Sequence, residues 1–354
     1  MKLKKLNLNS EDLFLLDSFF KKEIKGNYRY GTMGFFYWKI LLNKSMKGFV
    51  NGIYVNSSLA STTSITPKDL LINNNLIKAA EIGDTYTNSK YRGRGFFSTL
   101  VNKSRAQTEK SGIHFIYGLP NSQSLPMHLK MCDMKISPNI KPYSFRYQMD
   151  IKKFIKSKAG SIIANILNFI FKFFIRIHHL FLILYNQFLN KYAIKLTENL
   201  PNDFDDFWYK AQKEWDFIFT RKSEFLNWRF CLNPEKYFFL IVRKETKIIG
   251  YLVYKVIYSN YESKIVIADI LFLNKHKSAL NLCLEKIRNF SFLHNINFIY
   301  TWLDIKSIYI PIIKLNGFLY KKNIFFINYI NDFSLSLSSK LKKIHFTISD
   351  SDNV

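Results

Sequence analysis

The chain has 354 residues, enough for two domains, and 48% of them are hydrophobic, which is ample material for packed interiors. Its formal charge of +26 favours anionic partners, but Lys greatly outnumbers Arg, so nucleic-acid recognition through base contacts is not expected. Three widely separated cysteines, without CxxC or Cys/His spacing, argue against a disulfide framework and a zinc site. Together with the lack of an apolar leader, they predict a reducing, cytoplasmic location.

The first 150 residues alternate short apolar runs with helical patterns. GFVNGIYVN (48–56) and LASTTSI (59–65) predict a strand pair, and LIKAAEIGDTYT (76–87) predicts a third strand. An amphipathic helix follows over 94–112, ending at Gly112, and IHFIYGLPN (113–121) reads as a buried strand. A short helix from Ser122 to Met131 and a last strand complete the order. This order predicts a mixed α/β layer.

A glycine pair stands between the third strand and the amphipathic helix, in YRGRGFFSTL (91–100). Gly93 and Gly95 alternate with Arg92 and Arg94 in a chain that has only 13 glycines. The start of a helix carries free amides and a partial positive charge, and glycine allows a phosphate to approach the backbone. The context therefore predicts an anion-binding turn; a plain surface turn is the alternative.

A segment dense in apolar side chains, residues 159–189, dominates a predicted helical linker over 151–195. Lys172 and Arg176 interrupt its centre, which leaves apolar flanks shorter than the roughly 20 residues that a membrane span needs. Its polar residues recur at steps of three or four and predict one narrow polar stripe. They are Asn165, Asn168, Lys172, Arg176 and His179.

Three interpretations of this linker stay open: a core helix between the domains, a helix lying in the membrane interface, or a helix that spans the membrane. The basic run IKKFIKSK just before it favours the interfacial interpretation, in which Lys and Arg reach anionic head groups. The protein would then be peripheral on the inner face of the membrane.

The chain repeats itself after the linker. Trp38-Lys39 with Asn43 recurs as Trp228-Arg229 with Asn233, and two further matches keep the same order. We infer that residues 196–330 repeat the fold of residues 1–150 as a degenerate second copy. The further matches are IHFIY (113–117) with INFIY (296–300) and LKMCDM (129–134) with IKLNGF (313–318).

The tail, 331–354, mixes a basic run with an acidic end and is predicted to be a solvated terminus.

The turn of RGRG between a strand and an amphipathic helix, followed by a strand and an Asn-led helix, resembles the GNAT acetyltransferase superfamily. Its pattern is Arg/Gln-x-x-Gly-x-Gly/Ala; Arg92 and Gly95 fill the first and fourth places, and Phe97 stands at the sixth. The resemblance covers roughly residues 30–150 and, more weakly, 196–330. It implies two GNAT-like mixed-sheet α/β domains joined by the hydrophobic helical segment.

The resemblance also implies acetyl-coenzyme A (acetyl-CoA) as co-substrate, with no metal. Its pyrophosphate would bind the amides of the turn, its pantetheine arm would follow the end of the preceding strand, and Asn121 matches an asparagine that often contacts the cofactor. In the second copy the turn reads Lys275 to Ser278 and lacks both glycines, so no such binding is predicted there. The implied cofactor-binding residues are Thr85, Tyr86, Thr87, Arg92, Gly93, Arg94, Gly95, Phe96, Phe97 and Asn121.

Acetyl transfer needs a polarised carbonyl and a group that takes the acceptor's proton. Asp84 and Glu81 lie on the strand before the turn, where the family often places its base. Three residues apart on a strand, they are expected to point to opposite faces. His128 lies close to the place of the family's usual acid, a Tyr, and is the candidate proton donor.

These features predict an enzyme, an acetyltransferase that uses acetyl-CoA and a small-molecule or lipid-linked acceptor with an amine or hydroxyl group. The tandem layout with an apolar, basic linker resembles GNAT proteins of surface-polysaccharide synthesis, which suggests an amino sugar or a lipid-linked sugar. Two alternatives remain. One is a tandem-GNAT aminoacyl transferase; the other is a non-catalytic basic module that binds membranes or nucleic acid on a GNAT fold.

Overall fold

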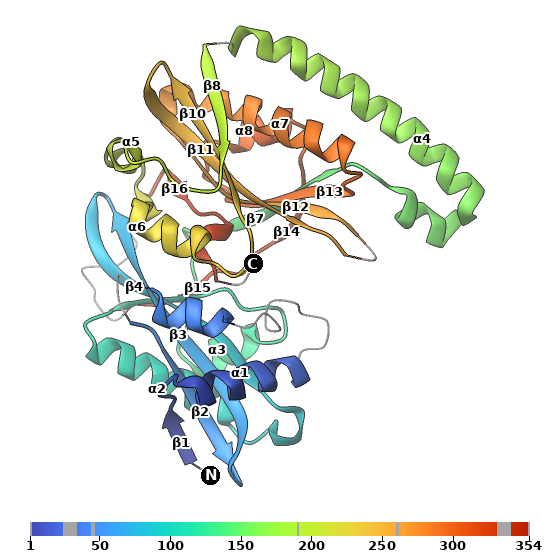
Figure 1. Cartoon of the computed structure of the whole chain (residues 1–354). Helices are drawn as coiled ribbons and strands as arrows, with labels where there is room; N and C mark the ends of the chain where they lie inside the picture. Colours follow the sequence, from blue (N-terminus) through green and yellow to red (C-terminus); the bar gives the residue numbers. More distant parts are fainter. Residues whose placement is uncertain are drawn as a thin grey trace.

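Two β-sheets, each covered by helices, make up the computed structural model, and the C-terminal end of the chain lies between them (Figure 1). The mixed α/β class with two sheets is as predicted. The structure describes residues 2–23, 34–43, 47–189, 191–259, 262–330 and 341–352.

The first sheet is built on an antiparallel meander of β2 (Phe49–Val55), β3 (Ser58–Ile72) and β4 (Asn75–Thr87). β5 (Phe115–Gly118) returns parallel to β4 after helix α2 (Phe96–Lys110). These elements match the strands and helix expected from sequence. The remaining elements around this sheet are β1 (Lys2–Lys5), α1 (Ser10–Glu23), α3 (Leu125–Met131), β6 (Lys135–Ile136), β9 (Phe217–Phe219), β15 (Ile327–Ile330) and β16 (Ile344–His345).

Asparagine makes both hairpin turns of this meander possible. Asn56 and Ser57 have φ of 47° and 63°, and Asn73 and Asn74 have φ of 49° and 64°. Two-residue hairpin loops need this left-handed backbone, which Asn tolerates better than most residues. The turns fix the register in which β3 contacts both of its neighbours.

The second sheet follows the same order of elements. β10, β11 and β12 form a meander, α7 crosses over to β13, and α8 leads to β14, as β2 to β6 do with α2 and α3 in the first sheet. The elements are β7 (Pro142–Gln148), α4 (Lys152–Asn186), β8 (Tyr192–Thr197), α5 (Phe204–Ala211), α6 (Ser223–Leu226), β10 (Phe238–Lys244), β11 (Lys247–Ile257), β12 (Lys264–Phe272), α7 (Leu280–Leu293), β13 (Phe298–Asp304), α8 (Ile310–Leu315) and β14 (Leu319–Asn323).

The two halves exchange a strand. β7 follows the first set of elements in the chain but lies between β13 and β14 of the second sheet. β15 follows the second set but lies between β5 and β6 of the first sheet. The division that the sequence suggested, 1–150 and 196–330, therefore differs from the division into sheets, because each sheet takes its penultimate strand from the other half.

The motif that revealed the repeat forms the contact between the halves. The indoles of Trp38 and Trp228 stack with centroids 5.4 Å apart and planes at 14°. Each indole N–H donates to the other tryptophan's carbonyl oxygen, at 2.6 and 2.9 Å. Both residues lie in matching π-helical turns, Tyr37–Leu41 and Asn227–Cys231. The contact is thus reciprocal and almost completely buried.

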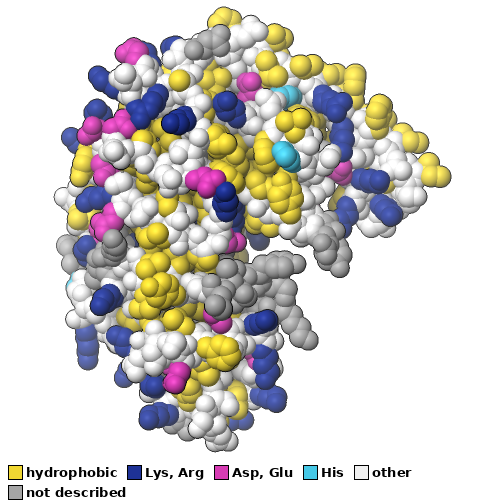
Figure 2. Space-filling view, viewed as in Figure 1, with side chains coloured by type: hydrophobic (Ala, Val, Ile, Leu, Met, Phe, Trp, Pro, Cys, Tyr) yellow, Lys and Arg dark blue, Asp and Glu magenta, His cyan; other side chains and the backbone are white. Residues whose placement is uncertain are grey.

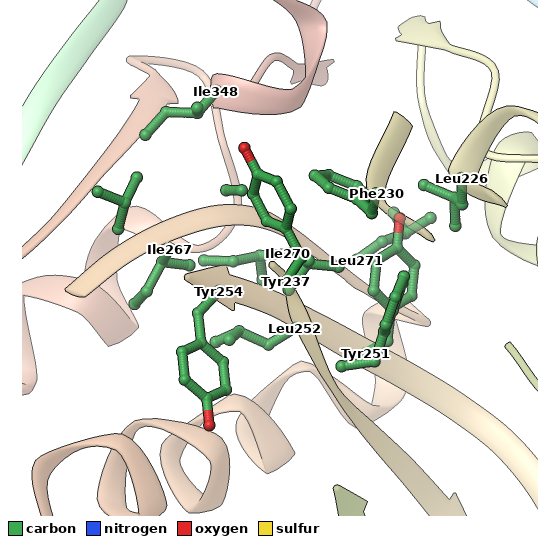
Figure 3. Close-up of a cluster of buried hydrophobic side chains, with 14 of the residues drawn as sticks. Leu226, Phe230, Tyr237, Tyr251, Leu252, Tyr254, Ile267, Ile270, Leu271 and Ile348 are labelled. Carbon is green, nitrogen blue, oxygen red and sulfur yellow. The ribbon is translucent and has the colours of Figure 1, made fainter. Parts of the chain in front are cut away.

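The prediction of a solvated tail is wrong for residues 344–352, although Lys342 and Lys343 are exposed; residues 331–340, 353 and 354 lie outside the described residues. From Ile344 to Asp352 every residue is buried. β16 pairs with β9, and Ile348 belongs to the same buried apolar cluster as Leu226 and Tyr251 (Figure 3). The acidic end of the tail is held by buried basic side chains, an arrangement that composition alone does not reveal.

Helix α4 lies along one side of the second half and packs against α7 (Figure 1). By length and composition, the stretch Lys152–Leu189 could cross a membrane, yet only 17% of its most apolar window is buried. The alternative of a core helix is therefore wrong, because most of its apolar surface faces outward.

We expect Trp38→Ala to lower the free energy of unfolding by about 3–5 kcal/mol, because it removes a buried indole and leaves a cavity beside Trp228. Tyr37→Ala is the matched control: Tyr37 is 47% exposed, and the change should cost about 0.5 kcal/mol or less. Denaturant unfolding of the three proteins measures the difference. Equal stability of the two variants would show that the stacked pair does not join the halves.

Candidate functional site

The strands β4 and β5 part in the middle of the first sheet. They pair in parallel at Ala79↔Phe115, Ala80↔Ile116 and Glu81↔Tyr117. β4 then runs on to Thr87, paired on its other side with β3. Beyond Glu81 this edge of β4 has no strand pairing among the described residues.

A β-bulge follows the point where the strands part. Thr62 pairs with Tyr86 and Ser64 with Gly83, so Asp84 and the residue after it oppose a single residue of β3. Asp84 takes up the extra length with a left-handed φ of 48°. The expectation that Glu81 and Asp84 point to opposite faces is wrong, because the bulge shifts the alternation and both carboxylates enter one buried ion network.

The end of β4 directs backbone groups toward the parted edge. Tyr86 O accepts from Ser61 Oγ at 2.9 Å, and Asn88 N–H donates to Ala60 O at 3.0 Å, so these two residues face β3. By alternation, the amides and carbonyls of Thr85 and Thr87 face the other edge. The edge offers hydrogen bonds to an extended ligand lying between the strands.

The RGRG turn sits at the end of this edge and opens helix α2. Gly93 and Gly95 have φ of 78° and 73°, and a Cβ at either would meet nothing within 4 Å. The glycines are therefore required by backbone angle. The helix makes its first backbone hydrogen bond from Thr99 N–H to Gly95 O at 3.0 Å, which leaves the preceding amides at the N-terminus outside the helical ladder.

Two arginines stand at this positive helix end. Arg92 lies over the ring of Tyr86 at 5.7 Å and donates to Thr87 O at 3.3 Å, and Arg94 lies over Tyr91 at 5.4 Å. Both are exposed. Cations at a helix N-terminus oppose the helix dipole, so this arrangement is favourable only when an anion binds there. The turn is accordingly suited to a phosphate or pyrophosphate.

Asn121 and Phe97 lie close to the turn and have local roles. Asn121 Oδ1 accepts from the backbone N–H of Ser124 at 2.8 Å and closes the turn that leads into α3. The ring of Phe97, at the sixth place of the turn motif, packs edge-on against His128 at 4.9 Å. Burial lowers the pKa of His128 to about 4. Its imidazole is therefore neutral at neutral pH, and the surroundings do not favour its predicted role as proton donor.

The carboxylates of β4 belong to a buried group of charges that we call the central ion network. Lys39 Nζ lies 2.5 Å from Asp84 Oδ2 and 3.4 Å from Asp352 Oδ2. Lys68 Nζ lies 2.7 Å from Glu81 Oε2 and 3.0 Å from Asp352 Oδ1. All five side chains are almost completely buried.

The tail extends this network to the second sheet. Arg221 Nη2 lies 2.7 Å from Asp350 Oδ1, and Arg221 Nε lies 2.8 Å from Asp269 Oδ2. Arg229 Nη2 donates to Ser351 O at 2.8 Å. Basic side chains of both halves thus hold one acidic segment between them.

The acids of the network differ in their affinity for protons. Burial raises the pKa of Glu81, and the negative charge of Asp352 raises it further, while Lys68 and Lys39 oppose the shift. For Asp352, the effect of burial is outweighed by Lys68 and Lys39, and its pKa is lowered. Glu81 is therefore the acid of this pair that binds a proton more readily.

Sequence reasoning found Glu81 and Asp84 but missed Lys39, Lys68 and Asp352. Two signals were present: Lys39 belongs to the repeated Trp-Lys/Arg motif, and Lys68 with its neighbour Asp69 interrupts a long run of uncharged residues. The role of Asp352 could not be read from sequence, because it depends on contacts with residues more than 270 positions away.

Two strands of the second half also part, but side chains of the protein form hydrogen bonds to the edge that is left free. β12 and β13 pair only up to Val266↔Tyr300. Beyond that point His345 Nε2 donates to Ile270 O at 2.7 Å, and Tyr309 Oη accepts from Phe272 N–H at 2.7 Å. These contacts support the expectation that the second copy does not bind acetyl-CoA in this manner.

Within the described residues, no group of three or more His, Cys, Asp or Glu side chains is placed to hold a metal ion.

A family model described as an acetyltransferase (GNAT) domain matches residues 22–127. No curated protein matches the chain. Solved structures match over nearly its whole length at low identity, and at such identity they show the fold alone.

One similar structure is a probable N-acyltransferase from Enterococcus faecalis, with 13% identity and a TM-score of 0.61 over 93% of this chain and 72% of that one. Another is the N-myristoyltransferase of Saccharomyces cerevisiae, determined with bound myristoyl-CoA, with 12% identity and a TM-score of 0.62 over 93% and 82%. A GCN5-related N-acetyltransferase from Anabaena variabilis has 13% identity and a TM-score of 0.60 over 94% and 73%. Residues 22–127 thus match the GNAT acetyltransferase domain, and the similar structures share the fold over most of the chain.

Proposed function

We propose that the protein is an acyl-CoA-dependent acyltransferase that moves an acetyl group to an amine or hydroxyl acceptor. One observation carries the proposal: an anion-binding turn at the start of α2 continues directly into the unpaired edge of β4. A nucleotide pyrophosphate on the turn would place an extended pantetheine arm along Thr87 and Thr85. The thioester would then lie near the bulge and Glu81.

Bound acyl-CoA supplies an activated thioester. The protein orients the thioester and accepts the proton that the acceptor loses. A backbone N–H of the parted edge, at Thr85 or Thr87, stabilises the negative charge that develops on the carbonyl oxygen. The acceptor's nitrogen or oxygen forms a bond to the carbonyl carbon as the C–S bond breaks, and CoA leaves as the thiolate. The acceptor's proton must pass to a base.

We assign the proton to the carboxylate of Glu81. It lies at the last pair before the strands part, and its raised pKa brings it closer to neutrality than an ordinary glutamate. Asp84 is the alternative on the same face. Its carboxylate is engaged by Lys39, at 2.5 Å, and Ser64, at 2.6 Å, as that of Glu81 is by Lys68, at 2.7 Å, so position and the raised pKa decide for Glu81. Asp352 raises the proton affinity of Glu81 and acts as a positioning residue.

The net charge of the chain bears on the class of acceptor. The overall charge of +26 favours an acceptor that carries phosphate, such as a nucleotide-linked or lipid-linked amino sugar. A screen that starts with these compounds is the direct route to the acceptor, once binding of the co-substrate is established.

The anion-binding turn can be tested by adding the same charge at either end of one helix. Gly95→Asp should weaken acetyl-CoA binding about tenfold or more, because a carboxylate would face the pyrophosphate. Gly112→Asp is the control: Gly112 follows α2, has a φ of 79°, and would bring an added Cβ within 4 Å of no neighbouring atom. Calorimetric titration of the full chain measures both affinities.

If the two glycine variants bound acetyl-CoA with equal affinity, the proposal that the pyrophosphate binds at this turn would be wrong. A folded wild-type protein that does not bind acetyl-CoA at all would overturn the acetyltransferase assignment. The aminoacyl transferase or the non-catalytic binding module would then be favoured.

Replacing the base should change the pH dependence of the reaction. Glu81 accepts a proton only when ionised, so kcat/KM should fall as the pH drops through its pKa, above the ordinary value of 4.5. Glu81→Gln should lower kcat/KM about 100-fold or more and remove this acidic limb, with acetyl-CoA affinity unchanged. An unaltered profile in the variant would exclude Glu81 as the base.

Asp352→Asn provides an independent test of the same arrangement. Loss of its negative charge should lower the pKa of Glu81 and move the acidic limb to lower pH, without abolishing activity. A merely structural role for Asp352 would change stability and leave the position of the limb where it was. Steady-state rates across a pH series distinguish the two results.

A further inference from the structure

The long helix α4 turns polar residues toward the protein and apolar residues outward, the opposite of a surface helix on a water-soluble protein. Such a helix turns apolar residues inward and polar residues outward. In α4 the residues facing the protein include Asn168, His179 and Asn186, all buried, whereas most large apolar side chains are exposed. The predicted polar stripe is divided, because Asn165 and Arg176 lie on the exposed side.

The protein-facing side is fixed by polar contacts along its length. Asn168 Nδ2 donates to Asp150 Oδ2 at 3.0 Å near the start of the main helix. His179 Nε2 lies 2.6 Å from Asn289 Oδ1 of α7, and Asn186 Nδ2 donates to Glu285 Oε2 of α7 at 2.6 Å. The helix is therefore held lengthwise against the second half.

The opposite side presents a continuous apolar surface. Figure 2 shows hydrophobic side chains along the projecting edge where Figure 1 places α4. Phe169 is 75% exposed and Phe188 is 86% exposed, values that are costly in water for side chains of this size. The other members that matter are Ile162, Phe173, Phe174 and Phe181.

Basic residues cluster at one end of this surface. The chain breaks its helical geometry at Gly160, which has φ of 78° and ψ of 174°. The short segment before that kink carries four exposed lysines. They are Lys152, Lys153, Lys156 and Lys158.

We propose that the exposed face of α4 binds the surface of a lipid bilayer that contains anionic lipids. The apolar side chains would enter the boundary between head groups and acyl chains, and the lysines before the kink would contact anionic head groups. Arg176, on the exposed side, can extend its charge to the head groups while its stem stays among the acyl chains. This inference stands apart from the acyl transfer assigned to the first half.

The contacts of α4 favour a helix that lies in the membrane plane. To span a bilayer, the helix would have to leave α7 and expose Asn168, His179 and Asn186 to lipid, together with Lys172, which lies 2.9 Å from Asp150. A second copy of the chain is disfavoured as the occupant, because the net charge of +26 opposes association.

Two matched phenylalanines provide the test. Phe169→Asp should weaken binding of the purified full chain to phosphatidylcholine vesicles containing phosphatidylglycerol by about tenfold or more. Phe14→Asp is the control, because Phe14 on α1 is also 75% exposed but lies in the first half. Both variants should keep the thermal stability of the wild type, since neither side chain is buried. Vesicle co-sedimentation measures the binding.

The charge contribution is tested in the same assay. Lys152→Gln with Lys156→Gln should reduce binding, whereas Lys21→Gln with Lys22→Gln, on α1, should not. Wild-type binding should weaken in salt and on vesicles of phosphatidylcholine alone.

Several results would overturn the proposal. They are a wild type that does not bind the vesicles, equal binding by the two phenylalanine variants, or bound protein that only detergent releases, which would indicate a span. A lipid-free dimer that Phe169→Asp converts to a monomer, without effect on vesicle binding, would assign the face to a second copy.

Discussion

The central ion network is the constraint on which the rest of the molecule depends. Buried charges are stable only when each finds a partner, and removing one partner is more costly than removing the pair. Here the cations come from β3, from the two π-helical turns and from the segment after β9. The tail supplies Asp352 to the two lysines, Asp350 to Arg221 and a backbone carbonyl to Arg229. The position of the tail is therefore set by electrostatics as much as by apolar packing. Within this network, burial and the negative charge of Asp352 raise the pKa of Glu81.

The exchange of β7 and β15 joins the halves in a second way. Each sheet is complete only when the other half contributes a strand, and the stacked pair of Trp38 and Trp228 closes the contact between them. Duplicated units usually contact each other through surfaces that each could present alone. In this chain the halves share strands and buried charges, so neither sheet is complete without a strand from the other half. The halves nevertheless differ at the parted strands: His345 and Tyr309 contact the free edge in the second half, whereas no described strand pairs with the edge of β4 beyond Glu81.

Local features were predictable from sequence and long-range ones were not. The hairpin at Asn56 and the helix after Gly95 follow from backbone preferences of single residues, and the repeat follows from matching motifs. The exchanged strands and the buried tail follow from pairings between residues more than 120 positions apart, for which one sequence holds no signal. The shared face of Glu81 and Asp84 was missed for a local reason, since the left-handed backbone of Asp84 shifts the alternation of β4. Asp is one of the few residues that adopts that backbone readily, but its presence alone does not require it.

The strand exchange also has a consequence for biosynthesis. A ribosome releases the chain from its N-terminus, so the acyl-CoA-binding elements emerge long before β15 and the tail. Until those late segments arrive, β5 and β6 lack the strand between them, and Lys39 and Lys68 lack Asp352. The first sheet and the central ion network therefore stay incomplete until β15 and the tail have been synthesised. A prematurely terminated product would therefore lack β15 and Asp352 even though it carries every residue of the RGRG turn.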